Sequence, residues 1–149
     1  MARHRLLPRR LRGRNGRLAV SAVAAGLVLA LIARHAASNS GAQISASSSS
    51  NVALGQQLAG GYGWGTGPQW ACLDELWTRE SGWQAQVWNY AGSGAYGIPQ
   101  ALPAAKMAAA GPDWMTDPAT QIRWGLGYIA ATYGTPCGAW AHETADGWY

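Results

Sequence analysis

The chain has 149 residues, 48% of them hydrophobic, and a net charge of +4. That length accommodates one domain plus an extension. The first 50 residues hold eight arginines and no acid, whereas the remainder carries seven acids against three cations, a balance of −4. The basic character therefore belongs to the N-terminal segment and gives no argument for nucleic-acid binding by the folded part.

Residues 1–37 are predicted to form an export leader. A basic stretch, 1–17, precedes an apolar run, 18–33, and small residues suited to cleavage follow it. The run is short for a membrane span and long for a signal core, so both a cleaved signal peptide and a signal anchor remain open. A cleaved leader predicts a secreted or cell-wall-associated protein. An uncleaved one predicts membrane contact through the N-terminal segment alone.

Residues 38–50 are rich in serine and alanine, a composition typical of a disordered linker. The folded domain is predicted to span 51–149, beginning with a short helix over 51–59 and a glycine-rich loop over 60–68. All nine Trp and all six Tyr follow residue 60. A core of this size needs fewer, so some of these rings are expected to line a surface cleft.

A short amphipathic helix is predicted to end at Glu80. Leu73, Leu76 and Trp77 precede this acid by seven, four and three residues, which places all four side chains on one helical face. Gly82 is expected just past the helix end. Burial and the negative end of the helix dipole should both raise the pKa of Glu80. Such an acid can protonate a glycosidic oxygen, although an acid frayed into solvent is the ordinary alternative.

The uncharged run 93–100 is rich in Gly and Ser and ends in Ile-Pro-Gln. It predicts a tight turn or hairpin lined by neutral hydrogen-bonding groups, which suit a sugar polymer. Three helices are expected after it, supported by proline at the first position or glycine beyond the last: 103–110, 117–133 and 136–143. The domain is thus predicted to be α+β, mainly α, with one small β-hairpin or loop excursion.

Cys72 and Cys137 lie in the part predicted to be exported. An even number of cysteines outside the cytoplasm indicates a disulfide, with two buried free thiols as the alternative. The sequence shows no metal-ligand spacing and no Gly-Lys-Ser phosphate motif, so neither a metal nor a cofactor is expected. His142 is the only histidine after residue 50, which gives a Ser-His-Asp or Cys-His hydrolase little support.

From about Gly63 to Tyr149 the chain resembles actinobacterial transglycosylase-like domains of the lysozyme superfamily, which are related to soluble lytic transglycosylases. Segments in the matching order carry the resemblance: Trp70-Ala-Cys-Leu-x-x-Leu-Trp-x-x-Glu80-Ser-Gly-Trp83, Ser93-Gly-Ala-Tyr-Gly-Ile-Pro-Gln-Ala-Leu-Pro103, Thr120-Gln-Ile-x-Trp-Gly-Leu-x-Tyr-Ile129 and Tyr133-Gly-x-Pro-Cys-x-Ala-Trp140. The run 87–92 departs from the shorter turn that the family pattern leads us to expect.

The resemblance implies a lysozyme-like fold and cleavage of the MurNAc-β-1,4-GlcNAc bond of peptidoglycan by a monomer. Glu80 takes the position of the catalytic glutamate. The resemblance also makes Ser93, Tyr96, Gln100 and Trp140 candidates for substrate contacts.

No acid follows Glu80 in the sequence until Asp113, and both Asp113 and Asp117 resemble helix-boundary residues. A single-glutamate mechanism giving 1,6-anhydro products is therefore expected, rather than a two-carboxylate one. A non-catalytic cell-wall-binding or aggregation-promoting surface module is the alternative. A membrane-anchored structural protein, supported by the leader alone, is a third interpretation.

Overall fold

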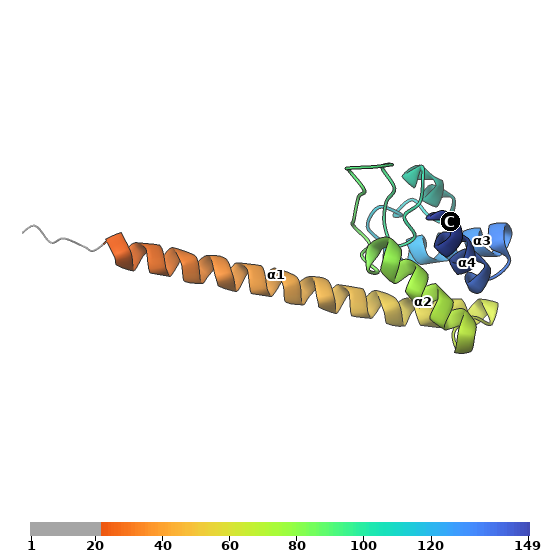
Figure 1. Cartoon of the computed structure of the whole chain (residues 1–149), viewed down its shortest axis with the longest axis horizontal. Coiled ribbons are helices and arrows are strands. Elements are labelled where there is room, and N and C mark those ends of the chain that lie inside the picture. The colour runs from red at the N-terminus through yellow and green to blue at the C-terminus, as the bar shows by residue number, and fades with distance from the viewer. Residues whose placement is uncertain (1–21) are drawn as a thin grey trace, which may run out of the picture. The chain divides into compact units, whose positions relative to one another are not determined.

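The computed structural model describes the backbone of residues 22–149 and the side chains from residue 36 onward. Its helices, shown in Figure 1, are α1 (Ala22–Ala59), α2 (Gly67–Ser81), α3 (Pro118–Tyr133) and α4 (Pro136–Asp146), with short 3-10 helices at Gly60–Tyr62 and Ala104–Ala109. Contacts within the chain separate two units, Met1–Ala37 and Ser38–Tyr149. Everything described below belongs to the second unit.

The predicted leader lies partly outside the described residues, which begin at Ala22. In the part of the chain that the structure does describe, no helix has both the length and the apolar character needed to cross a membrane.

Residues 38–50 are helical, so the prediction of a disordered linker is wrong. The hydroxyl of Ser45 donates to the Gly41 carbonyl at 3.0 Å, and that of Ser49 donates to the Ser45 carbonyl at 2.9 Å. These bonds, made to carbonyls four residues back, satisfy the hydroxyls without breaking the helix. Composition alone does not show that serine hydroxyls can bond to the helix carbonyls in this way. The second unit starts at Ser38 rather than at Asn51.

The last turns of α1 confirm the predicted helix over 51–59 and attach it to the core. Asn51 Nδ2 donates to the Trp83 carbonyl at 2.9 Å in a buried hydrogen bond. A Cβ on Gly55 would overlap the ring of Trp83, so the glycine is what permits this close approach. Ala59 is fully buried. The end of α1 is thus fixed by a side-chain bond, a close-packed ring and a buried alanine.

The mainly helical class is confirmed, and the core lies where α2, α3 and α4 meet. In Figure 1, α4 packs against both α2 and α3. The stripe predicted on α2 and one face of α3 point into this core, where the following side chains are fully or almost fully buried: Leu73, Leu76, Trp77, Ile122, Leu126 and Ile129. At about 25 cal/mol for each Å² of apolar surface removed from water, such side chains stabilise the fold by roughly 1.5–3 kcal/mol each.

The helix ends follow their local signals. Gly82 ends α2 with a left-handed φ of 59°, a conformation that glycine adopts without a steric penalty. At the start of α3, the Asp117 carboxylate accepts the amide protons of Ala119 and Thr120, and Pro118 occupies the first turn. Both of these sequence predictions are confirmed.

Two shorter predictions need correction. The segment 60–68 is not all loop, because it contains a 3-10 turn at its start and α2 begins already at Gly67. The predicted helix 103–110 is a 3-10 helix that begins after Pro103. Its buried side chains, Ala104 and Met107, are three residues apart, and the 3-10 period of three places both on the core side.

The β excursion is smaller than a hairpin. Within residues 22–149, β structure is limited to isolated bridges that pair Tyr96 with Trp88 and with Ala101. Most of the segment between Gly82 and Pro103 is turns. Its conformation must therefore be held by contacts with the helices rather than by a sheet.

Gln121 of α3, which is fully buried, provides those contacts. Its Oε1 accepts the Ile98 amide proton at 2.9 Å, and its Nε2 donates to the Ala85 carbonyl at 2.8 Å. Gly97, with φ 76°, lies so close that a Cβ would overlap the Gln121 amide. Ser81 at the end of α2 also donates to the Ile98 carbonyl at 2.8 Å. The turn that precedes Gln100 is thereby fixed beside the end of α2.

Candidate active site around Glu80

Glu80 lines a cavity of about 540 Å³ at the last turn of α2. Most of the other side chains in its wall are neutral and polar or aromatic: Asn89, Ser93, Gln100, Tyr128, Trp148 and Tyr149. Lys106 brings a positive charge to the same wall. Aromatic faces beside neutral donors and acceptors are well suited to a sugar ring, whose faces are apolar and whose edges carry hydroxyls.

The environment of Glu80 raises its pKa from 4.5 to about 7. Desolvation by burial is the largest cause, as the sequence predicts. The charge of Glu143 and a side-chain hydrogen bond with Glu143 raise it further, whereas the charge of Arg79 lowers it. Glu80 thus holds its proton at near-neutral pH while remaining open to a cavity, which is what a general acid requires.

Glu143 is the residue that the sequence argument missed. It lies on α4 and is only 3% exposed, and its Oε1 accepts a 2.8 Å ion pair from Arg79 Nε. A signal was present: Glu143 follows Pro136 and Ala139 by seven and four residues, and both are buried. An acid on an apolar stripe, the same anomaly that identifies Glu80, marks Glu143 as well.

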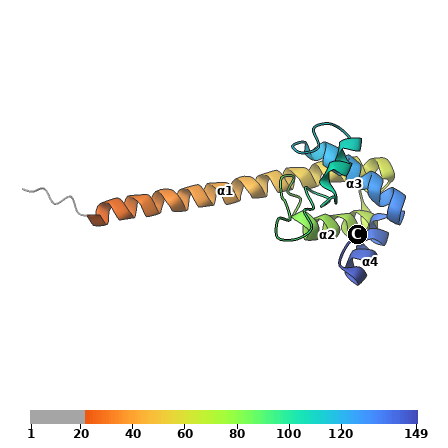
Figure 2. The same cartoon turned by 90° about the horizontal axis from the view of Figure 1, so that it is seen from above.

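Tyr149 also lines this cavity. Figures 1 and 2 show the C-terminus returning to the helices, and there the Tyr149 hydroxyl accepts a hydrogen bond from Trp77 Nε1 at 2.8 Å and donates to the Pro99 carbonyl at 2.9 Å. Burial, followed by the charge of Glu80, raises the pKa of Tyr149 well above 10. The phenol therefore stays neutral and links α2 to the turn before Gln100.

Of the predicted substrate contacts, Ser93 and Gln100 line the cavity together with Glu80. Gln100 has φ 47° and donates from Nε2 to the Gly97 carbonyl at 3.0 Å, which orients its amide. The Ser93 hydroxyl oxygen accepts the Ala95 amide proton at 3.2 Å. Both retain hydrogen-bonding capacity toward the cavity.

The other two predicted substrate contacts, Tyr96 and Trp140, lie outside the cavity wall. Tyr96 is 3% exposed, and its hydroxyl donates to the Met115 carbonyl at 2.6 Å, so its ring and hydroxyl both belong to the core. Trp140 packs against the core, with the Arg79 guanidinium 6.0 Å from its ring centre. Neither lines the cavity beside Glu80. A glycine-rich context does not reveal that Tyr96 has a backbone partner nineteen residues away.

Tyr128 and Trp148 supply aromatic surface that the sequence argument did not assign to the site. The rings of Tyr128 and Trp124 are stacked, with centroids 5.2 Å apart and an interplanar angle of 7°. Two aromatic residues four positions apart, beside the core stripe of α3 rather than on it, were the available signal.

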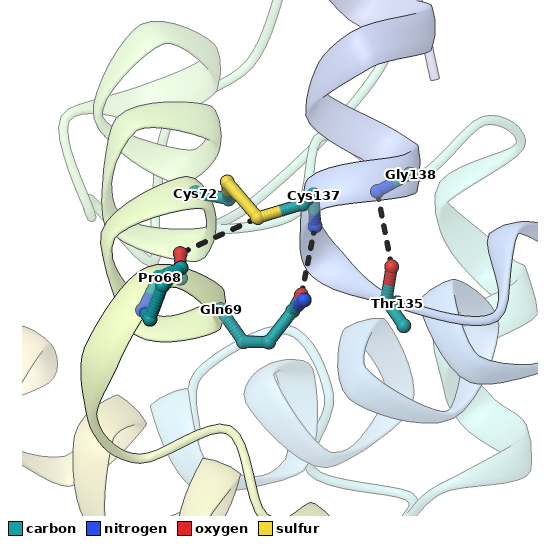
Figure 3. Close-up of a disulfide and its surroundings, with 6 residues drawn as sticks. All are labelled: Pro68, Gln69, Cys72, Thr135, Cys137 and Gly138. Atoms are coloured by element: carbon teal, nitrogen blue, oxygen red, sulfur yellow. Dashed lines mark hydrogen bonds between the residues drawn. A yellow bond between two sulfur atoms is a disulfide. The ribbon is translucent and has the colours of Figure 1, made fainter.

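The predicted disulfide is present, joining α2 to α4 (Figure 3). The Cα atoms of Cys72 and Cys137 are 5.0 Å apart. Gln69 Oε1 accepts the Cys137 amide proton at 3.1 Å, and Thr135 Oγ1 accepts that of Gly138 at 3.1 Å, so the start of α4 is capped from both sides (Figure 3). The disulfide and caps hold the two helices that carry Glu80 and Glu143.

A second cavity, of about 570 Å³, has no carboxylate in its wall and is therefore a poor candidate for acid chemistry. Its lining comes from the serine-rich part of α1, the turn after α2 and the start of α3: Ile44, Ser47, Ser50, Asn51, Gln84, Ala85, Gln86, Thr116 and Pro118. Among the described residues, no three His, Cys, Asp or Glu side chains gather as a metal site.

Comparisons of the chain with protein-family models, with curated proteins and with solved structures find no match.

Proposed function

We propose that this protein is a peptidoglycan-cleaving enzyme acting on the MurNAc-β-1,4-GlcNAc bond, with Glu80 as its general acid. The observation that carries the proposal is an acid with a pKa of about 7 in the wall of a cavity of about 540 Å³ lined by neutral polar and aromatic groups. The resemblance of the motifs around Glu80 and Gln100 to transglycosylase-like domains supports the same substrate. Lys106 in that wall suits the carboxylates that muramic acid and its peptide stems carry.

In the proposed reaction, Glu80 donates its proton to the glycosidic oxygen as the bond to the anomeric carbon breaks. The resulting carboxylate then accepts a proton from the hydroxyl that attacks that carbon. When the attacking group is the C6 hydroxyl of the same muramic acid, the product is a 1,6-anhydro sugar. When water attacks, the product is a reducing end.

Glu143 does not turn this into a two-carboxylate mechanism. It is 3% exposed and does not line the cavity, so it has no access to the anomeric carbon or to an attacking water. The structure therefore offers one acid to the substrate, which favours the single-glutamate route over the use of a second carboxylate as nucleophile or base.

The proposal predicts that the purified protein releases muropeptides from isolated peptidoglycan. Mass spectrometry of the soluble products distinguishes the routes, because a 1,6-anhydro end is lighter than a reducing end by one water. We expect anhydro products. Reducing ends alone would identify a lysozyme-like hydrolase. Binding to peptidoglycan without any release would instead support the wall-binding module.

A separate prediction concerns Gln100 in the wall of the cavity beside Glu80. Gln100→Asn keeps an amide at a position with positive φ, which asparagine tolerates, but withdraws the group from the cavity. Loss of one hydrogen bond of about 1 kcal/mol should weaken chitooligosaccharide binding about fivefold, measured by calorimetry. Because the part-buried bond from Gln100 Nε2 to the Gly97 carbonyl is also lost, the melting temperature should fall slightly.

Tyr96→Phe is the matched control for Gln100→Asn. It removes a buried hydroxyl and leaves the Met115 carbonyl without its donor. The melting temperature should therefore fall, while the affinity of the folded protein for the oligosaccharide stays unchanged. Weaker binding by Tyr96→Phe at an unaltered melting temperature would restore Tyr96 as a sugar contact.

A further inference from the structure

Helices α2 and α4 run in the same direction from the disulfide to the cavity. Cys72 is bonded to Cys137, and seven residues further along α2 Arg79 pairs with Glu143, which lies six residues further along α4. The two contacts fix the register of one helix against the other. Glu143 is thereby held at the level of Glu80, the next residue after Arg79.

The hydrogen bonds of Glu143 are incomplete. Its Oε1 is occupied by Arg79 Nε at 2.8 Å, but its Oε2 is buried and has no hydrogen-bond partner among the described residues. Tyr133, whose buried hydroxyl is also unpaired, does not serve it. A buried acceptor without a donor destabilises the folded state, and a charged acceptor does so more strongly. The protonated carboxyl of Glu80, which follows Arg79 on α2, is the donor that fits, because hydrogen bonding to Glu143 is among the causes that raise the pKa of Glu80.

We propose that Glu143 is the positioning residue for Glu80: anchored by Arg79, it holds the Glu80 carboxyl through a hydrogen bond that exists only while Glu80 is protonated. This inference rests on the proposed role of Glu80 as general acid. It adds what prepares Glu80 for that role, namely a second carboxylate that never touches the substrate.

The arrangement has two consequences for the reaction. Before proton transfer, the single O–H of Glu80 is directed to Glu143; when a glycosidic oxygen binds in the cavity, rotation of the carboxyl turns the same O–H towards it, and the bond to Glu143 is given up before the proton is transferred. After transfer, two carboxylates face one another and Glu143 loses its donor. Both changes favour the return of a proton to Glu80, and taking a proton from the attacking hydroxyl is the second half of the proposed mechanism.

Other titratable and charged groups surround the pair and must be considered in any pH experiment. They are Arg79 on α2, Tyr133 on α3, His142 and Asp146 on α4, Tyr149 at the end of the chain and Lys106 across the cavity. Both tyrosines have a raised pKa, and lysine and arginine ordinarily keep their charge below pH 8. Glu143 and Arg79 are the charged groups that shift the pKa of Glu80, so differences in its titration midpoint between variants report chiefly on them.

The test is a ¹³C NMR titration of the glutamate carboxyls in the full chain, with the Glu80 signal assigned by its loss in Glu80→Gln. In Glu143→Gln the Glu80 midpoint should fall from about 7 by about one pH unit or more, because a negative neighbour is gone and Arg79 remains. In Arg79→Gln the midpoint should rise, because the lowering charge is removed. Arg79 has a side chain 53% exposed, so this variant is expected to fold.

Glu75→Gln, at an exposed position of α2 one helical turn before Arg79, removes one negative charge that solvent screens, and should shift the midpoint far less than Glu143→Gln does. The fall in muropeptide release with rising pH should shift to lower pH in Glu143→Gln and to higher pH in Arg79→Gln. A merely structural Glu143 would lower stability without moving either curve, and unchanged midpoints in both variants would overturn the inference. Shifted midpoints without muropeptide release by any protein would refute the proposed function and leave the coupling of Glu143 to Glu80 established.

Discussion

Glu80→Gln should lower the proposed muropeptide release by at least about 100-fold, the usual contribution of a positioned general acid, and should leave the protein folded. Glutamine has nearly the shape of a protonated glutamate and can donate its amide hydrogen to Glu143 Oε2, but it has no proton to transfer to a leaving oxygen. Glu75→Gln makes the same chemical change on the exposed face of α2 and should release muropeptides at the wild-type rate. Equal release by wild type and Glu80→Gln would show that another group is the acid.

The proposed activity of the wild-type protein is expected to fall as the pH rises. The first step needs Glu80 protonated, and its pKa is raised to about 7. Release should therefore decline as the pH rises through 7, measured at fixed ionic strength between pH 4 and 8. A decline centred near pH 4.5, the ordinary value for this carboxyl, would mean that the folded protein does not protect the proton.

The raised pKa of Glu80 also makes the free energy of unfolding depend on pH. Because the unfolded chain ionises near 4.5 and the folded one near 7, the folded protein binds more protons between these values. The stability that Glu80 contributes is fully present below pH 4.5 and is lost as the pH rises to about 7. With allowance for partial exposure, this loss is about 2 kcal/mol. The free energies of unfolding of wild type and Glu80→Gln are measured by urea titration at each pH. Relative to wild type, the value for Glu80→Gln should increase by this amount between pH 4.5 and about 7, and the difference should stay constant outside this range.

Removal of the disulfide is the second large effect. Replacing both cysteines, Cys72→Ala with Cys137→Ala, opens a loop closed across 65 positions. Chain-entropy estimates assign about 4 kcal/mol to such a closure, a large part of the stability of a domain this size. The free energy of unfolding in urea should fall by about that amount. The variant also lacks the bond that sets the register of α2 against α4. In the fraction that remains folded, the titration curve of Glu80 should therefore broaden or its midpoint should fall.

The control for that experiment is the wild-type protein with and without reductant. Intact mass after alkylation should show no modified cysteine before reduction and two after it. Two cysteines that react in the unreduced protein, or a double variant as stable as wild type, would contradict a structural role for the bond.

Local signals in the sequence determined most of the helices. The stripe formed by Leu73, Leu76 and Trp77, the cap at Asp117 and the glycine at position 82 each act within one or two turns, and the structure agrees with all of them. The pairing of Cys72 with Cys137 also followed from the sequence, because two cysteines allow one intramolecular bridge.

Glu80 was predictable for the same reason, since an acid on an apolar face is a local contradiction. The sequence could not show which residues lie next to Glu80 in the folded protein. The sequence predicted burial, the largest cause of its raised pKa, together with the helix dipole, but it did not predict the contribution of Glu143, sixty-three positions away.

Only the tertiary structure decided which residues form the site. Tyr96 belongs to the core because its hydroxyl reaches Met115, and Tyr149 belongs to the cavity because it bonds Trp77 across 72 positions. The serine-rich segment is helical where composition predicted disorder. Periodicity and capping are short-range properties that a sequence displays directly. The meeting of α2 with α4 depends on how whole helices pack, and that packing, held by the disulfide and the Arg79–Glu143 ion pair, is what places a second carboxylate behind Glu80.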